Sequence, residues 1–141
     1  MDLETQSGKE LGAKPAVINI HKEVLCNDNF RTAIWTGTHL QVTVMSIPAG
    51  GEIGLEIHED LDQFIRVESG FGCVYMGATK SCVKFLGKIN PDYSVIVPAG
   101  TWHNITNPFS RPLKVYSVYA PPKHPFGTVH KTKLDSGLAE D

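Results

Sequence analysis

Short runs in which apolar and polar residues alternate fill most of the chain. In LQVTVMSI at 40–47, Val42, Val44 and Ser46 alternate with Gln41, Thr43 and Met45, and such alternation is the pattern of a β-strand with two different faces. Six further runs are six to eight residues long and are bounded by Gly, Pro or polar residues: IGLEIH (53–58), QFIRVES (63–69), GCVYMG (72–77), CVKFLG (82–87), YSVIVP (93–98) and LKVYSVYA (113–120). Short strands with such turns, and almost no helical period, predict an all-β sandwich or small barrel.

The first forty residues are less regular. Residues 1–15 are polar and end at a proline, so we expect a flexible N-terminal arm, or a strand that orders only on a partner subunit. AVINI at 16–20 is read as a short strand, the stretch at 21–29 as a single helical turn, and RTAIWTG at 31–37 as another strand. The remaining 16–141 has the length of a single domain with one core.

Two polar blocks carry the candidate chemistry. Glu56 and His58 are two residues apart, so on a strand both side chains project from the same face. Gln63 begins the next run, and His103 follows a Pro-Ala-Gly turn at 98–100. Two imidazoles, a carboxylate and an amide that converge on one point suit a divalent first-row metal ion.

The spacing of these blocks resembles the two motifs of the cupin superfamily. The matching positions are Gly50, Glu56, His58, Gln63 and Gly70 in the first block, and Pro98, Gly100, His103 and Asn107 in the second. The chain departs from the family at two of these positions, where Glu56 replaces a histidine and Gln63 replaces a glutamate. It also departs at a further position, where Asp92 stands in place of the second motif's leading glycine.

The resemblance covers a motif core at 40–120 and implies a cupin-like double-stranded β-helix, the jelly-roll barrel. It also implies one divalent cation, which could be Zn, Mn, Fe, Ni or Co, held by Glu56, His58, Gln63 and His103. Gln63 is the weak ligand and could instead orient a bound water, since a neutral amide oxygen binds poorly beside imidazole and carboxylate. Glu56 could stand off the metal as a general base.

Three functions are compatible with such a site. The first is a metal-dependent enzyme on a small oxygenated substrate, with isomerase-like proton transfer on a sugar or sugar acid, since similar single-domain cupins include sugar isomerases. The second is a metal-dependent dioxygenase, and the third is a non-catalytic module that binds or senses a small molecule. The acidic residues at 59–62 are either a source of a base or a solvated loop. Tyr75, Tyr116 and Tyr119 are either pocket donors or packing residues.

Charge and composition narrow the partners. The formal net charge is −2 at pH 7 and no basic cluster is present, so we expect neither nucleic acid nor membrane as a partner. Without a secretory pattern, the expected location is cytoplasmic. The three cysteines lack CxxC spacing and are expected to be buried, reduced thiols. We also expect a homodimer, formed by strand exchange or by packing of barrel faces.

The C-terminal tail at 121–141 contains two histidines in a stretch that is too apolar for a plain linker. We expect the tail to pack across a barrel edge, because an exposed edge strand needs cover. The alternative is that His124 or His130 enters the active site.

Overall fold

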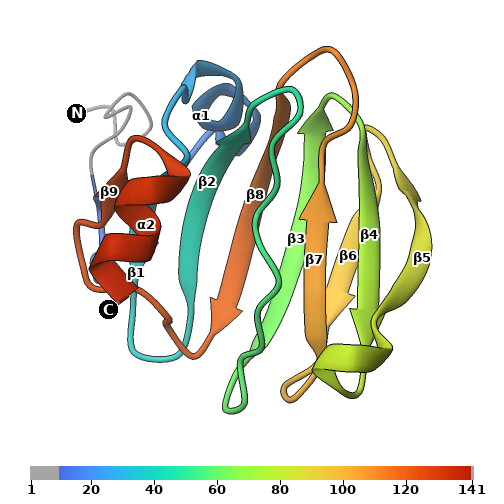
Figure 1. Ribbon diagram of the computed structural model, residues 1–141. Coiled ribbons are helices and arrows are strands. Elements are labelled where there is room, and N and C mark those ends of the chain that lie inside the picture. Colours follow the sequence, from blue (N-terminus) through green and yellow to red (C-terminus); the bar gives the residue numbers. More distant parts are fainter. Residues whose placement is uncertain (1–9, 141) are drawn as a thin grey trace.

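The computed structural model describes residues 10–140, which are mainly β-strand (Figure 1). The strands are β1 Arg31–Thr36, β2 Gln41–Ile47, β3 Asp62–Ser69, β4 Gly72–Gly77, β5 Lys84–Ile89, β6 Ser94–Val97, β7 Trp102–Thr106, β8 Leu113–Ala120 and β9 Val129–His130. The helices are α1 Ile20–Cys26, the 3-10 turn η1 Lys80–Cys82 and α2 Lys133–Glu140. Within this range, no helix has the length and apolar character needed to cross a bilayer.

The strands form two antiparallel sheets that pack face to face. One sheet has the order β6-β3-β8-β2-β1-β9 and the other has the order β5-β4-β7. In Figure 1 the smaller sheet lies in front of β3 and β6, and α2 lies in front of β1 and β9. The predicted all-β jelly roll is therefore confirmed.

The inner face of the larger sheet is polar at one end and apolar at the other. Strand register across β2, β8 and β3 aligns inward residues in rows, which are Gln41, Tyr119 and Gln63, then Thr43, Ser117 and Ile65, then Met45, Val115 and Val67. All nine side chains are buried. The last row belongs to the apolar core with Ile47, Ile105 and Leu113. The polar rows leave buried hydrogen-bonding groups at the end where the candidate metal ligands lie.

The segment at 16–20 was predicted as a strand, and this prediction is wrong. Residues 15–19 make no strand, and α1 begins at Ile20, because the Asn19 side chain accepts a hydrogen bond from the Lys22 N–H at 3.1 Å and caps the helix. Ile18 and Ile20 then pack on Val24 against the outer face of the larger sheet. The helical turn predicted immediately afterwards is confirmed.

The strand predicted at 53–58 is also absent. This segment pairs with β7 through two isolated bridges, Glu52 with Thr106 and Glu56 with His103. Gly54 lies between them with φ of 107°, a conformation that L side chains rarely adopt and that breaks a continuous ladder. The segment is extended at its ends and bent in the middle.

The C-terminal tail adds β9 to the open edge of β1. Arg31 pairs with His130 and Thr32 with Val129, and the Phe30 N–H donates to the Lys131 carbonyl at 3.1 Å. Residues 1–9 lie outside the described range, whereas the Leu11 N–H donates to Ile34 O at 2.9 Å and the Trp35 indole N–H to Lys14 O at 2.8 Å. Both ends of the described chain therefore contact β1.

The cysteines correct one expectation. All three are free, but Cys26 and Cys82 are exposed and Cys73 is half-buried. The prediction of buried cysteines is therefore wrong for Cys26 and Cys82, because Cys26 ends a surface helix and Cys82 lies in the surface turn η1.

Candidate metal centre

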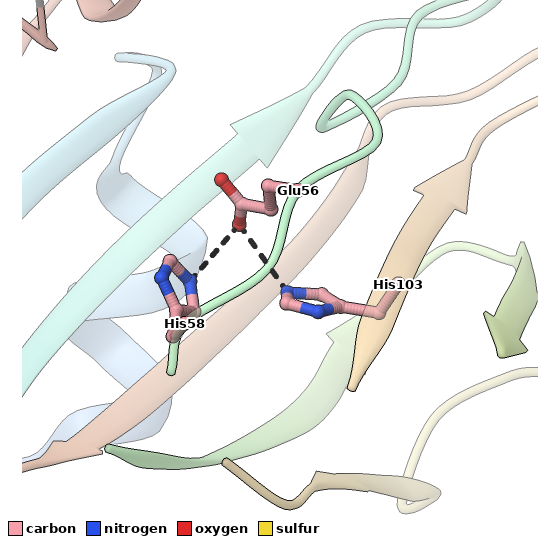
Figure 2. Close-up of side chains that lie close together, drawn as sticks. All are labelled: Glu56, His58 and His103. Atoms are coloured by element: carbon pink, nitrogen blue, oxygen red, sulfur yellow. Dashed lines mark ion pairs between the residues drawn. The ribbon is translucent and has the colours of Figure 1, made fainter. Parts of the chain in front are cut away.

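Three predicted ligands converge on one point inside the barrel. Glu56 Oε1 lies 3.3 Å from His58 Nε2 and 3.4 Å from His103 Nε2, as Figure 2 shows. One donor atom from each of the three residues lies within 4.8 Å of the others. Glu56 and His58 come from the bent segment between β2 and β3, and His103 comes from β7.

Backbone hydrogen bonds fix this arrangement. The Glu56 N–H donates to His103 O at 3.0 Å, and the His103 N–H donates back to Glu56 O at 2.9 Å. The turn before His103 is held from the other side, since the Gly100 N–H donates to His58 O at 2.8 Å and the Ala99 N–H to Asp62 Oδ1 at 2.9 Å. These hydrogen bonds join the two sequence motifs to each other.

The tautomer of His103 leaves a lone pair directed at Glu56. His103 Nδ1 lies 2.9 Å from the Thr101 carbonyl oxygen, which can only accept, so Nδ1 carries the hydrogen. When the ring is neutral, Nε2 presents its lone pair to a carboxylate oxygen, an unfavourable contact unless a proton or a cation lies between them.

Both histidines are buried, His103 at 1% exposure and His58 at 8%. Neither Nε2 atom makes a hydrogen bond with the described residues, because the contacts to Glu56 lack hydrogen-bond geometry. Buried nitrogens of this kind need a partner. Two imidazoles and one carboxylate are a donor set that first-row divalent ions accept, so these residues fit a metal ion.

Glu56 presents a charged carboxylate at neutral pH. Burial acts to raise the pKa of this carboxyl, but the polar contacts and charges of His103 and His58 outweigh burial. The pKa of Glu56 therefore lies well below its usual range. A permanently ionised carboxylate suits a ligand better than a general base, whose pKa should lie near the working pH.

Gln63 lies on the same inner face, at 3% exposure. Its Nε2 donates to Ser117 Oγ at 3.4 Å, and its Oε1 is buried without a hydrogen-bond partner among the described residues. An amide oxygen left in this state is available to a ligand or a bound water. Its role at the metal stays a prediction.

Two other groups named from the sequence lie elsewhere. Glu59 and Asp60 are exposed, and Asp62 accepts the Ala99 N–H, so the acidic turn is a solvated loop. Asn107, the last residue of the second motif, donates through Nδ2 to three carbonyls, those of Ile47, Pro48 and Arg111. This asparagine ties two turns together, and its amide is not free to bind a metal.

Of the three tyrosines considered, Tyr119 lies beside the metal centre. Its ring meets the His58 ring edge-on, with centroids 6.0 Å apart, and burial raises the pKa of its phenol. Tyr75 packs on Phe85 and Tyr116 on Phe64, which are packing roles.

Beyond Tyr119, the buried polar row continues into the tail. The His124 ring contacts the Tyr119 ring at 5.3 Å and the His130 ring at 6.0 Å. Arg31 adjoins them, with Nη1 3.1 Å from His130 Nδ1. Arg31 was not among the residues predicted from the sequence; its signal is a charged residue at the same parity as Ala33 on the predicted strand at 31–37.

The buried imidazole of His124 gives the protein an expected pH dependence. Burial, followed by the nearby charge of Arg31, lowers its pKa from 6.5 to about 3. The unfolded chain therefore binds more protons between these values, so stability is complete above pH 6.5 and is lost as the pH falls. We expect urea unfolding to show a loss of about 2 kcal/mol from this group between pH 7 and pH 5.

The matched variants are His124→Gln and His39→Gln, since His39 is exposed. His124→Gln should flatten the pH dependence in this interval, and His39→Gln should leave it unchanged. Equal pH slopes in wild type and His124→Gln would contradict the assignment.

The chain is similar in sequence and in structure to several known proteins. A family model for the cupin domain matches residues 43–119. The uncharacterized protein YrkC of Bacillus subtilis (strain 168) is 54% identical over 133 residues, which cover 94% of this chain and 72% of that protein. The uncharacterized protein L612 of Acanthamoeba polyphaga mimivirus is 36% identical over 122 residues, covering 86% and 74% respectively.

Among solved structures, the crystal structure of BH2720 from Bacillus halodurans is 53% identical, with a TM-score of 0.90. The alignment covers 92% of this chain and 98% of that one.

Proposed function

Because the chain belongs to the cupin family, we propose that Glu56, His58 and His103 hold one divalent cation and that the protein is a metal-dependent enzyme. The observation that carries this proposal is the single carboxylate oxygen of Glu56, which lies 3.3 and 3.4 Å from two buried imidazole nitrogens. The substrate we propose is a small oxygenated molecule such as a sugar or sugar acid.

The reaction that we favour is an isomerase-like proton transfer. A bound cation would act as a Lewis acid that polarises a carbonyl or hydroxyl oxygen of the substrate. Three protein donors leave coordination positions open for such oxygens, and the burial of both histidines limits access of water. Tyr119 keeps its proton at neutral pH, because burial raises the pKa of the phenol, and can donate a hydrogen bond beside His58.

A dioxygenase is the second candidate, and the chemistry of the ligand set is the observation that supports it. Two histidines and one carboxylate with open positions are the donor set of non-haem Fe(II) oxygenases. Glu56 at the place of a family histidine gives this chain that set. The choice among Zn, Mn, Fe, Ni and Co, the homodimer and the cytoplasmic location stay predictions.

One experiment separates these functions. Protein purified without added metal is analysed for its elements, then reconstituted and screened against aldoses, uronates and enolic substrates with oxygen uptake recorded. Isomerised product without oxygen uptake supports proton transfer, and oxygen uptake selects the dioxygenase. Tight binding without turnover would identify a binding module, and absence of stoichiometric metal would overturn the proposal.

Variants of Glu56 test whether this carboxylate is a ligand. We expect Glu56→Ala to weaken the binding of all divalent ions at least tenfold, which corresponds to about 1.4 kcal/mol of binding free energy. Glu56→His restores an imidazole and removes a negative charge, so it should keep metal but shift its preference towards Zn, Ni or Cu. Titration of metal-free protein with Mn and with Zn measures both effects.

Glu56→Gln distinguishes a ligand from a base at nearly constant shape. If Glu56 is a metal ligand, Glu56→Gln should lose metal affinity together with turnover. Unchanged affinity for Mn and Zn with turnover removed would show instead that Glu56 acts as a general base.

A further inference from the structure

Arg31 carries a buried charge that lacks a carboxylate partner within residues 10–137. Its side chain lies on the inner face of β1, opposite Met45, and is 2% exposed. The ion pairs within residues 10–137 involve other cations, and none places a carboxylate oxygen within 4 Å of this guanidinium. A buried charge is costly unless an opposite charge compensates it.

The contacts of the guanidinium leave its Nε–H without a hydrogen-bond partner among the described residues. Nη1 lies 3.1 Å from His130 Nδ1 and donates to Ser136 Oγ at 2.6 Å, and the Phe30 ring lies 5.3 Å from the guanidinium carbon. Because arginine only donates, His130 Nδ1 accepts and contributes no compensating charge through this bond. Nε is buried and makes no hydrogen bond with the described residues.

Arg31 shares the barrel interior with the metal centre. Tyr119 lies between them, because its ring contacts the His58 ring on one side and the His124 ring on the other, with centroids 6.0 and 5.3 Å apart. The His124 ring in turn contacts the His130 ring, whose Nδ1 lies 3.1 Å from Arg31 Nη1. Two further buried atoms of the inner face, Thr43 Oγ1 and Gln63 Oε1, also make no hydrogen bond with the described residues. Unsatisfied polar atoms thus line the interior from Arg31 to the candidate ligands.

We propose that Arg31 anchors a carboxylate group of the substrate, while other oxygens of the same molecule lie at the metal centre. This assignment rests on the proposed function and narrows its substrate to small carboxylates. A bound divalent cation and Arg31 together outweigh the single negative charge of Glu56, so an anionic ligand balances the interior. A single planar edge of one arginine fits a carboxylate, whereas a phosphate group usually meets several donors.

The test measures binding of small dicarboxylates to the metal-loaded protein by calorimetry. Oxalate, malonate and succinate vary the spacing between carboxylates, and each is compared with its half-amide, which keeps the shape but has one charge fewer. We expect the best dicarboxylate to bind at least about tenfold more tightly than its half-amide, the usual scale of a hydrogen bond to a charged group. Arg31→Gln should lose this preference.

Ser136→Ala is the matched control, because it removes the contact between Arg31 and α2 and leaves the charge in place. It should keep the preference for the dicarboxylate. If Arg31 only fastened the tail, Ser136→Ala and Arg31→Gln would lower thermal stability together and both would bind dicarboxylate as wild type does, which would overturn the proposal.

Metal content, measured on the same samples, separates this proposal from the proposed function. Absence of stoichiometric metal in wild type contradicts the metal centre. Normal metal content without a preference for dicarboxylate over half-amide overturns the role of Arg31, and this comparison needs no variant to fold. Arg31-dependent binding of phosphonoacetate that is tighter than that of malonate would overturn the carboxylate class.

Discussion

His58→Ala and His103→Ala should each abolish stoichiometric metal binding and leave a folded β-barrel. Each imidazole supplies one of the three donor groups that the structure brings together, and Glu56 supplies the third. Loss of residues that merely orient a metal ligand already costs about 10–100-fold in metal affinity. Loss of a ligand itself should therefore exceed about a hundredfold. Elemental analysis of purified variants and titration of the metal-free proteins give the result.

The fold should survive because the apolar core lies at the other end of the barrel. Its members include Met45, Val67, Val115 and Leu113, none of which belongs to the ligand cluster. Far-ultraviolet circular dichroism and thermal melts check this point. Removing a buried imidazole leaves a small cavity, but it also removes an unsatisfied buried nitrogen, so the two effects oppose each other.

Gln63→Ala is the comparison that ranks the ligands. A water can replace an amide oxygen, so this variant should retain most of its metal. If it loses metal as completely as His58→Ala, Gln63 is a full ligand and our ranking is wrong. Metal content unchanged in either histidine variant would contradict the site itself.

Asn107→Ala should lower the free energy of unfolding by about 3 kcal/mol without affecting the metal site directly. Its side chain is 0% exposed and makes four hydrogen bonds: Nδ2 donates to Ile47 O, Pro48 O and Arg111 O, and Oδ1 accepts the Phe109 N–H. Alanine would leave the three carbonyl oxygens and the Phe109 N–H without this hydrogen-bond partner in a largely buried environment. Each buried polar group left unsatisfied costs about 1–3 kcal/mol before any relaxation.

Asn104→Ala is a control three residues earlier, on β7. Asn104 makes two side-chain bonds, accepting the Gly54 N–H at 2.9 Å and donating to Glu52 at 2.8 Å, and it is less buried than Asn107. Its replacement should cost about 1 kcal/mol. Equal losses in urea unfolding for the two variants would show that Asn107 has no special structural role.

The predictions from sequence succeeded where the physics is local. Alternation of apolar and polar residues follows from the two-residue period of a strand, so the runs that became β2, β3 and β8 could be read directly. The fixed spacing of Glu56 and His58 and the turn before His103 indicated ligands that the structure brings together. The local signal was ambiguous at 16–20 and 53–58. Asn19 caps a helix in the first segment, and Gly54 interrupts strand pairing in the second with its positive φ.

The sequence alone therefore determined an all-β sandwich or small barrel, through the period of its strands, and the three side chains that meet at the candidate metal centre, through their spacing. The jelly-roll class followed from the resemblance of the two motifs to the cupin superfamily. The tertiary structure decided the partners that are distant in sequence. It joined Arg31 to His130 and Ser136, placed Tyr119 against His58, and gave Asn107 a structural role. Such contacts depend on strand register and on where the tail closes the sheet, and no local pattern of residues specifies either.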